Sequence, residues 1–206
     1  MARLLDAKCR QCRREGCKLF LKGEKCTSKK CPIERRPVAP GQHGEGRKKV
    51  TQYGIQLREK QKVKRAYGIL EKQFKRYYEE AERMKGVVGE NMLSLIERRL
   101  DNVIYRMGIG ASRAESRQIV NHGHVTVNGK KVNIASFRVK VGDIIEIKEN
   151  KKEKEPFKAL KGMKVVMPKW LEFNPDMLKG SILALPKRDD VDMNIREQLI
   201  IELYSR

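Results

Sequence analysis

Four of the five cysteines in this chain have the spacing of a metal site. Two residues separate Cys9 from Cys12, four separate Cys26 from Cys31, and thirteen lie between the two pairs. Two short loops that each present two thiolates can surround one tetrahedral ion, the usual arrangement at structural zinc sites. The spacing therefore predicts one structural Zn²⁺ held by these four residues, with an iron–sulfur cluster or metal-free cysteines as the alternatives.

The fifth cysteine, Cys17, fits neither spacing, and we expect it to be a small buried side chain. The first residues lack the apolar segment of a signal peptide, so we expect reduced thiols rather than disulfides. The longest uninterrupted apolar run has four residues, 182–185, whereas a membrane span needs about 20. We therefore expect neither secretion nor residence in a membrane.

A large positive charge surrounds these cysteines. The 206 residues carry 47 Lys and Arg against 26 Asp and Glu, a net charge of +21. Residues 1–50 hold fifteen of the basic and five of the acidic side chains. Such an excess opposes compaction unless a polyanion neutralises it, and nucleic acid gains affinity from each neutralised phosphate. A heat-adapted charged surface is the alternative, but it would hold Lys and Glu in near balance.

In the first half of the chain, an extended strap and a basic helix must position this positive charge. Residues 35–49 are dense in Pro, Gly and basic residues and indicate an extended strap that is ordered on binding, or alternatively a flexible linker. A basic helix is predicted over 55–67, ended by Gly68. Candidate RNA contacts here are Arg3, Arg10, Arg13, Arg14, Lys22, Arg35, Arg36, Gln42, His43, Arg47, Lys48, Lys49, Arg58, Lys60, Lys62 and Arg65.

Two further helices and a joint are predicted before the second half. The first has the aromatic face Phe74, Tyr77 and Tyr78, which we interpret as helix packing, and residues 86–89 mark a joint. The second helix, over 93–107, has Arg98, Arg99 and Arg106 on its other faces and ends at Gly108.

The second half has the pattern of helices followed by a small sheet. A capping box over 112–115 opens a short helix that ends at Gly123. Asn128-Gly129 predicts a type I′ hairpin, and alternation predicts strands near 137–141, 145–147, 163–173 and 180–185. An N-x-x-E cap at 194–197 opens a last helix. The capped helix and hairpin form a candidate RNA-binding face, with a solvated helix as the alternative, through Arg113, Arg117, Gln118, His122 and Lys130.

Several of these motifs resemble known RNA-binding proteins. Residues 112–114, 122–123, 125–129 and 141–143 resemble the S4-type RNA-binding domain. The four spaced cysteines, together with 35–37, 40–44, 57–62, 99–103 and 194–206, resemble the universal family of bacterial 30S (small-subunit) ribosomal S4 proteins over essentially the whole chain.

This resemblance implies a fold and a division into domains. The fold is α+β, with a metal-binding N-terminal segment, a helical domain and an inserted S4-type RNA-binding domain. The implied domains are a zinc knuckle and strap at 1–46, a helical domain at 47–90 with 190–206, and the S4-type domain at 91–189.

The resemblance also implies a non-enzymatic structural constituent of the cytoplasmic small ribosomal subunit. Its partners would be a multi-helix junction in the 5′ domain of 16S rRNA, where it nucleates 30S assembly, and ribosomal protein S5. Near the mRNA entrance, Arg47, Lys48 and Lys49 would line the mRNA path and influence translational accuracy. One alternative is an rRNA-modifying enzyme, which would need a catalytic domain of ~100 residues or more. The other is a DNA-binding regulator, which the match to these motifs disfavours.

Overall fold

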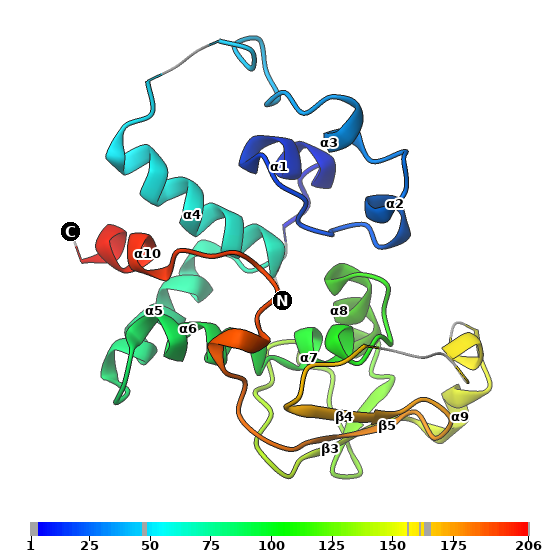
Figure 1. Cartoon of the computed structure of the whole chain (residues 1–206). Helices are drawn as coiled ribbons and strands as arrows, with labels where there is room; N and C mark the ends of the chain where they lie inside the picture. The colour runs from blue at the N-terminus through cyan, green and yellow to red at the C-terminus, as the bar shows by residue number, and fades with distance from the viewer. Residues whose placement is uncertain (1–3, 47–48, 156, 161, 163–165, 206) are drawn as a thin grey trace. The chain divides into compact units, whose positions relative to one another are not determined.

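The computed structural model describes residues 4–46, 49–155, 157–160, 162 and 166–205. The chain forms two compact units, Met1–Met92 with Met193–Arg206 and Leu93–Asp192 (Figure 1). The predicted three-domain division stays a prediction. Three candidate RNA contacts, Arg3, Arg47 and Lys48, lie outside the described residues.

Three short helices open the first unit: α1 (Lys8–Glu15), α2 (Glu24–Thr27) and α3 (Pro32–Arg35). The prediction of two loops carrying the cysteines was wrong, because Cys9 and Cys12 lie three residues apart on α1 and so face the same side of it. Gly16 ends this helix with a left-handed φ of 69°.

The helical part of the first unit consists of α4 (Gln52–Ala66), α5 (Glu71–Arg83) and α10 (Glu197–Tyr204). The side chain of Thr51 caps α4 by accepting the Gly54 N–H at 3.1 Å. The aromatic face of α5 is buried as predicted, and the Tyr204 ring of α10 stacks 4.8 Å from the Tyr78 ring. Aromatic packing therefore joins α5 and α10.

The predicted start of the last helix was wrong. Helix α10 begins at Glu197 rather than directly after Asn194, and no side chain caps it. The preceding backbone bonds to α4 instead, since the Asn194 carbonyl accepts from Lys62 and the Arg196 N–H donates to Glu59 at 3.0 Å. These tertiary bonds replace the first helical turn.

The single helix predicted over 93–107 is two helices, α6 (Val88–Glu97) and α7 (Leu100–Arg106). Helix α6 also begins inside the predicted joint at 86–89. The break at 98–99 arises because Arg99 pairs with Arg138 in an isolated bridge and the Leu100 N–H donates to Phe137 at 2.8 Å. The predicted strand at 137–141 is reduced to this bridge.

The capped helix and the hairpin of the second unit confirm the local predictions. Ser112 accepts the Glu115 N–H at 3.3 Å at the start of α8 (Arg113–Asn121), and the Glu115 carboxylate accepts the Ala111 N–H at 2.8 Å. Strands β1 (Val125–Val127) and β2 (Lys130–Lys131) flank Asn128 and Gly129, whose φ values of 49° and 76° fit the type I′ turn.

The sheet has five antiparallel strands in the order β2-β1-β3-β5-β4. It is completed by β3 (Ile144–Ile147), β4 (Leu171–Asn174) and β5 (Lys179–Ile182). Trp170 is 2% exposed and belongs to the core cluster shared by α7, α8 and the sheet. Helices together with this sheet confirm the α+β class.

Short helices occupy two connections of the second unit. Between β3 and β4 lie α9 (Glu149–Lys152) and η1 (Lys158–Leu160), and η2 (Arg188–Asp190) follows the sheet. Among the described residues, no helix combines the length and apolar character that crossing a membrane requires.

Candidate nucleic-acid interface and cysteine cluster

The four predicted metal ligands line one small cavity of about 10 Å³ in the first unit. Cys9 and Cys12 come from α1 and Cys26 from α2, while Cys31 precedes α3. Cys12, Cys26 and Cys31 are buried and Cys9 is half-buried. Helices separated in sequence thus bring the four thiols to one place.

Some contacts of these thiols stabilise the thiolate form, whereas their burial destabilises it. The Lys22 N–H donates to the Cys26 sulfur at 3.3 Å, a contact that stabilises a thiolate. Burial raises the pKa of the Cys12 thiol, and the backbone hydrogen bond with Leu19 opposes that rise. A bound cation would compensate this desolvation, because metal ligation deprotonates thiols.

The described residues nevertheless contain no group of three or more His, Cys, Asp or Glu arranged to hold a metal ion. The structure therefore shows a shared cavity and not a metal centre. Cys17 lies outside this cavity and is half-buried rather than buried. Burial raises its thiol pKa, and Lys62, Glu15 and Glu59 act on it electrostatically.

Most of the N-terminal candidates for RNA contact are at the surface. The predicted polar side chains of this segment are exposed except Arg13, which is half-buried; the exposed residues are Arg10, Arg14, Lys22, Arg35, Arg36, Gln42, His43 and Lys49. Multiple exposed cations over a short length of chain can neutralise several phosphates together.

The basic residues of α4 are used differently. Arg58 and Arg65 both pair with Glu15 of α1, whose side chain is 1% exposed, with Arg58 at 3.2 Å. Lys60 is buried and pairs with Glu71 at 2.6 Å. These three cations bind α4 to α1 and α5, so their candidate role as RNA contacts competes with a structural one.

A similar division occurs on the capped helix. The Arg113 Nε donates to Asn102 Oδ1 at 2.8 Å, and its guanidinium lies 4.5 Å from the centre of the Tyr105 ring. Arg117 pairs with Asp101 at 3.5 Å. Both arginines are half-buried against α7, while the other three candidates of this face, Gln118, His122 and Lys130, are exposed.

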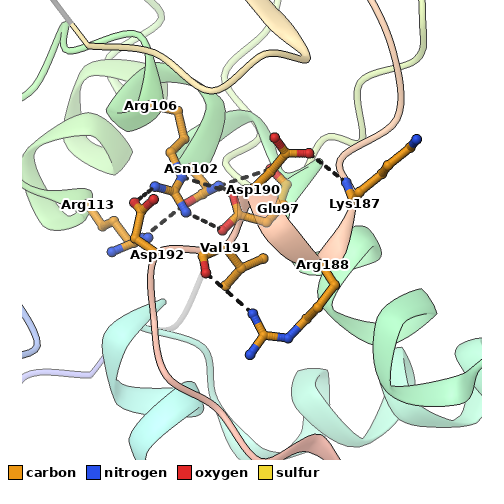
Figure 2. A network of polar contacts seen from close by, with 9 residues as sticks. All are labelled: Glu97, Asn102, Arg106, Arg113, Lys187, Arg188, Asp190, Val191 and Asp192. Carbon is orange, nitrogen blue, oxygen red and sulfur yellow. Dashed lines mark hydrogen bonds and ion pairs between the residues drawn. The ribbon is translucent and has the colours of Figure 1, made fainter.

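A buried network holds Arg113 in place (Figure 2). Asn102 donates through Nδ2 to the Glu97 carboxylate at 2.5 Å while its oxygen accepts from Arg113. Arg106 binds both Glu97 oxygens, at 2.8 and 3.1 Å, and also contacts Asp192. Arg99 and Arg106, which were predicted on the other faces of one helix, are both buried with carboxylate partners.

One cluster of basic residues was missed by the sequence patterns. Burial lowers the pKa of His124, and Lys151, His122, Lys148 and Lys154 add to that effect by electrostatic repulsion. The stretch at 148–158 reads as a mixed-charge loop, so its lysines gave no sign of gathering near His124. These residues place positive charge around His124.

Two family models match residues of this chain up to position 145. Residues 3–97 match the ribosomal protein S4/S9 N-terminal domain, and residues 98–145 match the S4 domain. The chain is 59% identical to small ribosomal subunit protein uS4 of Ruminiclostridium cellulolyticum and 59% identical to that of Clostridioides difficile, with all of each chain covered. The protein belongs to the ribosomal protein S4 family.

The uS4 protein of Thermoanaerobacter sp. is 56% identical, again with both chains fully covered. Membership in the ribosomal protein S4 family identifies the chain as a structural, non-enzymatic protein, as its motifs predicted. The capped α8 and the β1–β2 hairpin lie inside the matched S4 domain, and the cysteine cavity lies inside the matched N-terminal domain.

Proposed function

We propose that this chain is a structural constituent of the small ribosomal subunit that binds 16S rRNA in the cytoplasm. The observation that carries the proposal is the set of exposed cations in the N-terminal segment, in a chain whose full-length relatives are small-subunit proteins; these cations are Arg10, Arg14, Lys22, Arg35, Arg36 and Lys49. We further propose that it binds a multi-helix junction of the rRNA 5′ domain and thereby nucleates 30S assembly. Its neighbours would then include ribosomal protein S5.

Binding to a fragment of the 16S rRNA 5′ domain tests the rRNA role. Replacing the exposed pair, Arg35→Ala/Arg36→Ala, should weaken binding at least tenfold at physiological salt, because each lost phosphate contact removes charge-assisted affinity. The control Lys75→Ala/Lys179→Ala removes two charges that are paired with Glu79 and Glu146. Equal affinity of both variants and the wild type would contradict the proposal.

A contact with mRNA near the entrance of the small subunit is the second part of the proposal. Lys49 is exposed, and its predicted companions Arg47 and Lys48 lie outside the described residues. We expect a photoreactive group at position 49 to crosslink to mRNA in assembled subunits and Lys49→Glu to change the frequency of miscoding. Crosslinks to rRNA alone, with unchanged miscoding, would contradict this role.

We also propose that Cys9, Cys12, Cys26 and Cys31 hold one structural zinc ion. Support comes from the cavity that the four thiols share and from the Lys22 N–H that donates to Cys26. When bound, the ion would link α1, α2 and α3 without taking part in any reaction. The segment has few buried apolar side chains, so zinc binding would contribute to its folding.

Elemental analysis of freshly purified protein tests the metal. We expect one zinc per chain, loss of zinc in Cys9→Ser and Cys26→Ser, and retention of zinc in Cys17→Ser, whose side chain lies outside the cavity. Iron with visible charge-transfer absorbance would favour an iron–sulfur cluster instead. Protein free of any metal would overturn the proposal.

A further inference from the structure

The segment that follows β3 carries a lysine at every third position, at Lys148, Lys151 and Lys154. Its backbone bonds repeat with the same period. The Lys151 N–H donates to the Lys148 carbonyl at 2.9 Å, and the Lys154 N–H donates to the Lys151 carbonyl at 3.0 Å. Side chains three residues apart lie on the same side of such a chain of turns. We call Lys148, Lys151 and Lys154 the lysine row.

The lysine row is fixed at both ends by contacts within the second unit. At its start, the Lys148 N–H donates to the His124 carbonyl at 2.9 Å. The next position of the same period is Phe157, whose N–H donates to the Lys154 carbonyl at 2.9 Å. The Phe157 ring is 3% exposed and lies 5.7 Å from the His124 ring. Binding a ligand to a row that is already ordered costs less conformational entropy.

Two further basic side chains reach the same place from other elements. The His122 ring, directly after α8, lies 5.8 Å from the His124 ring. The Lys131 side chain of β2 passes over Gly123, since a Cβ atom at that glycine would lie 2.5 Å from Lys131 Cε and 3.3 Å from its Nζ. His122 and Lys131 are both exposed. We call these two residues and the lysine row the basic patch.

The basic patch carries positive charge that the protein does not neutralise. In the part of the chain that the structure describes, no carboxylate pairs with Lys131 or with the lysine row. After burial, the groups that lower the pKa of His124 are the lysine row and His122, which repel its charged form. A bound anion would relieve this repulsion without displacing an internal partner.

The acidic residues of the same stretch do not interrupt the lysine row. They are Glu149, Glu153 and Glu155, and each falls between the members of the three-residue period. The period itself contains only the lysine row and Phe157. The side of the segment that is anchored to His124 is therefore the side that carries the lysines.

The surroundings of the basic patch favour RNA over an acidic protein as the anion. The core of a protein interface is apolar. Among the described residues of 122–132 and 148–158, however, no large apolar side chain is exposed. Phosphates need only accessible cations, which this surface supplies.

The arginines at the start of α8 are already occupied. Arg113 is bonded to Asn102 and lies against the Tyr105 ring, and Arg117 pairs with Asp101. A phosphate at that end of α8 would compete with these partners. The lysine row also lies beyond residue 145, where the match to the S4 domain ends.

We propose that the basic patch binds the phosphate backbone of RNA and is the principal RNA contact of the second unit. This inference rests on the rRNA-binding function proposed above and adds a site that the sequence patterns did not indicate. The ammonium groups of the lysine row and of Lys131 would pair with phosphate oxygens. Such contacts carry no sequence information, so the patch would position the RNA rather than select its bases.

Affinity of full-length variants for the 16S rRNA 5′ domain fragment tests the patch. We expect Lys151→Ala/Lys154→Ala to weaken binding at least about fivefold and to reduce the slope of log affinity against log salt by about 2. The control Lys169→Ala/Lys187→Ala removes two exposed lysines of the same unit that line a different cavity. It should leave affinity and slope unchanged. Circular dichroism verifies that both variants fold.

Lysine acetylation of the wild-type chain, measured at each residue by mass spectrometry, locates the contact without any substitution. The rRNA fragment should slow acetylation of the lysine row at least about threefold, because lysines paired with phosphates are shielded from the reagent. Acetylation of Lys169 and Lys187 should not change. An octamer of glutamate serves as the acidic-peptide probe and should protect the row less than the RNA does.

The outcomes separate this inference from the rRNA-binding function. A wild-type chain that does not bind the fragment would contradict that function and the basic patch with it. If the wild type binds and Lys151→Ala/Lys154→Ala binds equally well, only the basic patch is wrong. Protection of the lysine row by the glutamate octamer as strong as that by the RNA would make the patch a site for acidic protein segments and would also overturn the proposal.

Discussion

At the residue scale, the most constrained group is the Glu97 carboxylate. It is fully buried and bonded to Asn102 and to both donors of the Arg106 guanidinium fork. Removing one partner of a buried pair leaves an uncompensated charge, which usually costs about 3–5 kcal/mol. We expect Glu97→Ala to lower the free energy of unfolding of the second unit by about that amount.

The measurement is urea unfolding followed by Trp170 fluorescence, because that residue lies in the core of the same unit. Asp192→Ala is the control. It removes the other carboxylate partner of Arg106, which is 76% exposed, and should cost less than about 1 kcal/mol. If both variants unfold at the same urea concentration, Glu97 does not stabilise the unit in this way.

Glu71 gives a prediction about pH. Burial would raise its pKa, but hydrogen bonds from Lys60, Lys64 and Tyr204 lower the pKa to about 2. A carboxyl whose pKa is depressed by folding stabilises the protein above its unfolded value near 4.5, and that contribution disappears as the pH falls toward 2. Because the side chain is 45% exposed, screening reduces the effect to below about 1 kcal/mol.

We therefore expect Glu71→Gln to be less stable than the wild type at pH 7 and nearly equal to it close to pH 2. Thermal unfolding of both proteins between these pH values, followed by far-ultraviolet circular dichroism, checks the convergence. A difference in stability that stays constant over the whole range would contradict the depressed pKa.

At the scale of elements, the start of α8 is set by one side chain. Ser112 accepts the Glu115 N–H, and losing such a cap typically costs about 1 kcal/mol. We expect Ser112→Ala to lower the stability of the second unit by that amount and Ser112→Asp, which keeps an acceptor, to retain most of it. Unfolding curves that coincide for Ser112→Ala and the wild type would show that the cap is unimportant.

Elements defined by local chemistry were predictable from the sequence. The Ser112 cap, the turn at 128–129 and the alternation of β3 each depend on neighbouring residues. The break between α6 and α7 was not predictable from the sequence, because it depends on a bridge between Arg99 and Arg138, which is 39 positions later. Long-range backbone bonds leave no periodic signal in a short window, and for the same reason the start of α10 was misplaced.

The candidate site was predictable to a similar degree. The four cysteines that the spacing grouped do line one cavity, and their role as zinc ligands stays a prediction. Residue type alone did not separate exposed cations such as Arg35 from the buried Lys60, because both follow the same basic pattern. Only the positions of Glu15 and Glu71 in the fold show which cations already have partners.

At the scale of the whole molecule, the net charge of +21 is not one uniform surface. The exposed N-terminal cations can exchange counterions for phosphates, while Arg58, Lys60 and Arg65 already neutralise carboxylates of the protein. RNA affinity should therefore depend on a minority of the 47 basic residues.

Salt dependence distinguishes these groups. A plot of log affinity for the 16S rRNA fragment against log salt should fall steeply for the wild type, because each neutralised phosphate releases counterions. We expect Arg35→Ala/Arg36→Ala to reduce the steepness by about 2, roughly 1 for each lost phosphate contact. Arg65→Ala should leave the slope unchanged while lowering the free energy of unfolding, because Arg65 pairs with Glu15 and does not contact RNA. A reduced slope for Arg65→Ala would show that Arg65 contacts RNA phosphates. A nearly flat wild-type plot would show that phosphate contacts do not dominate the affinity.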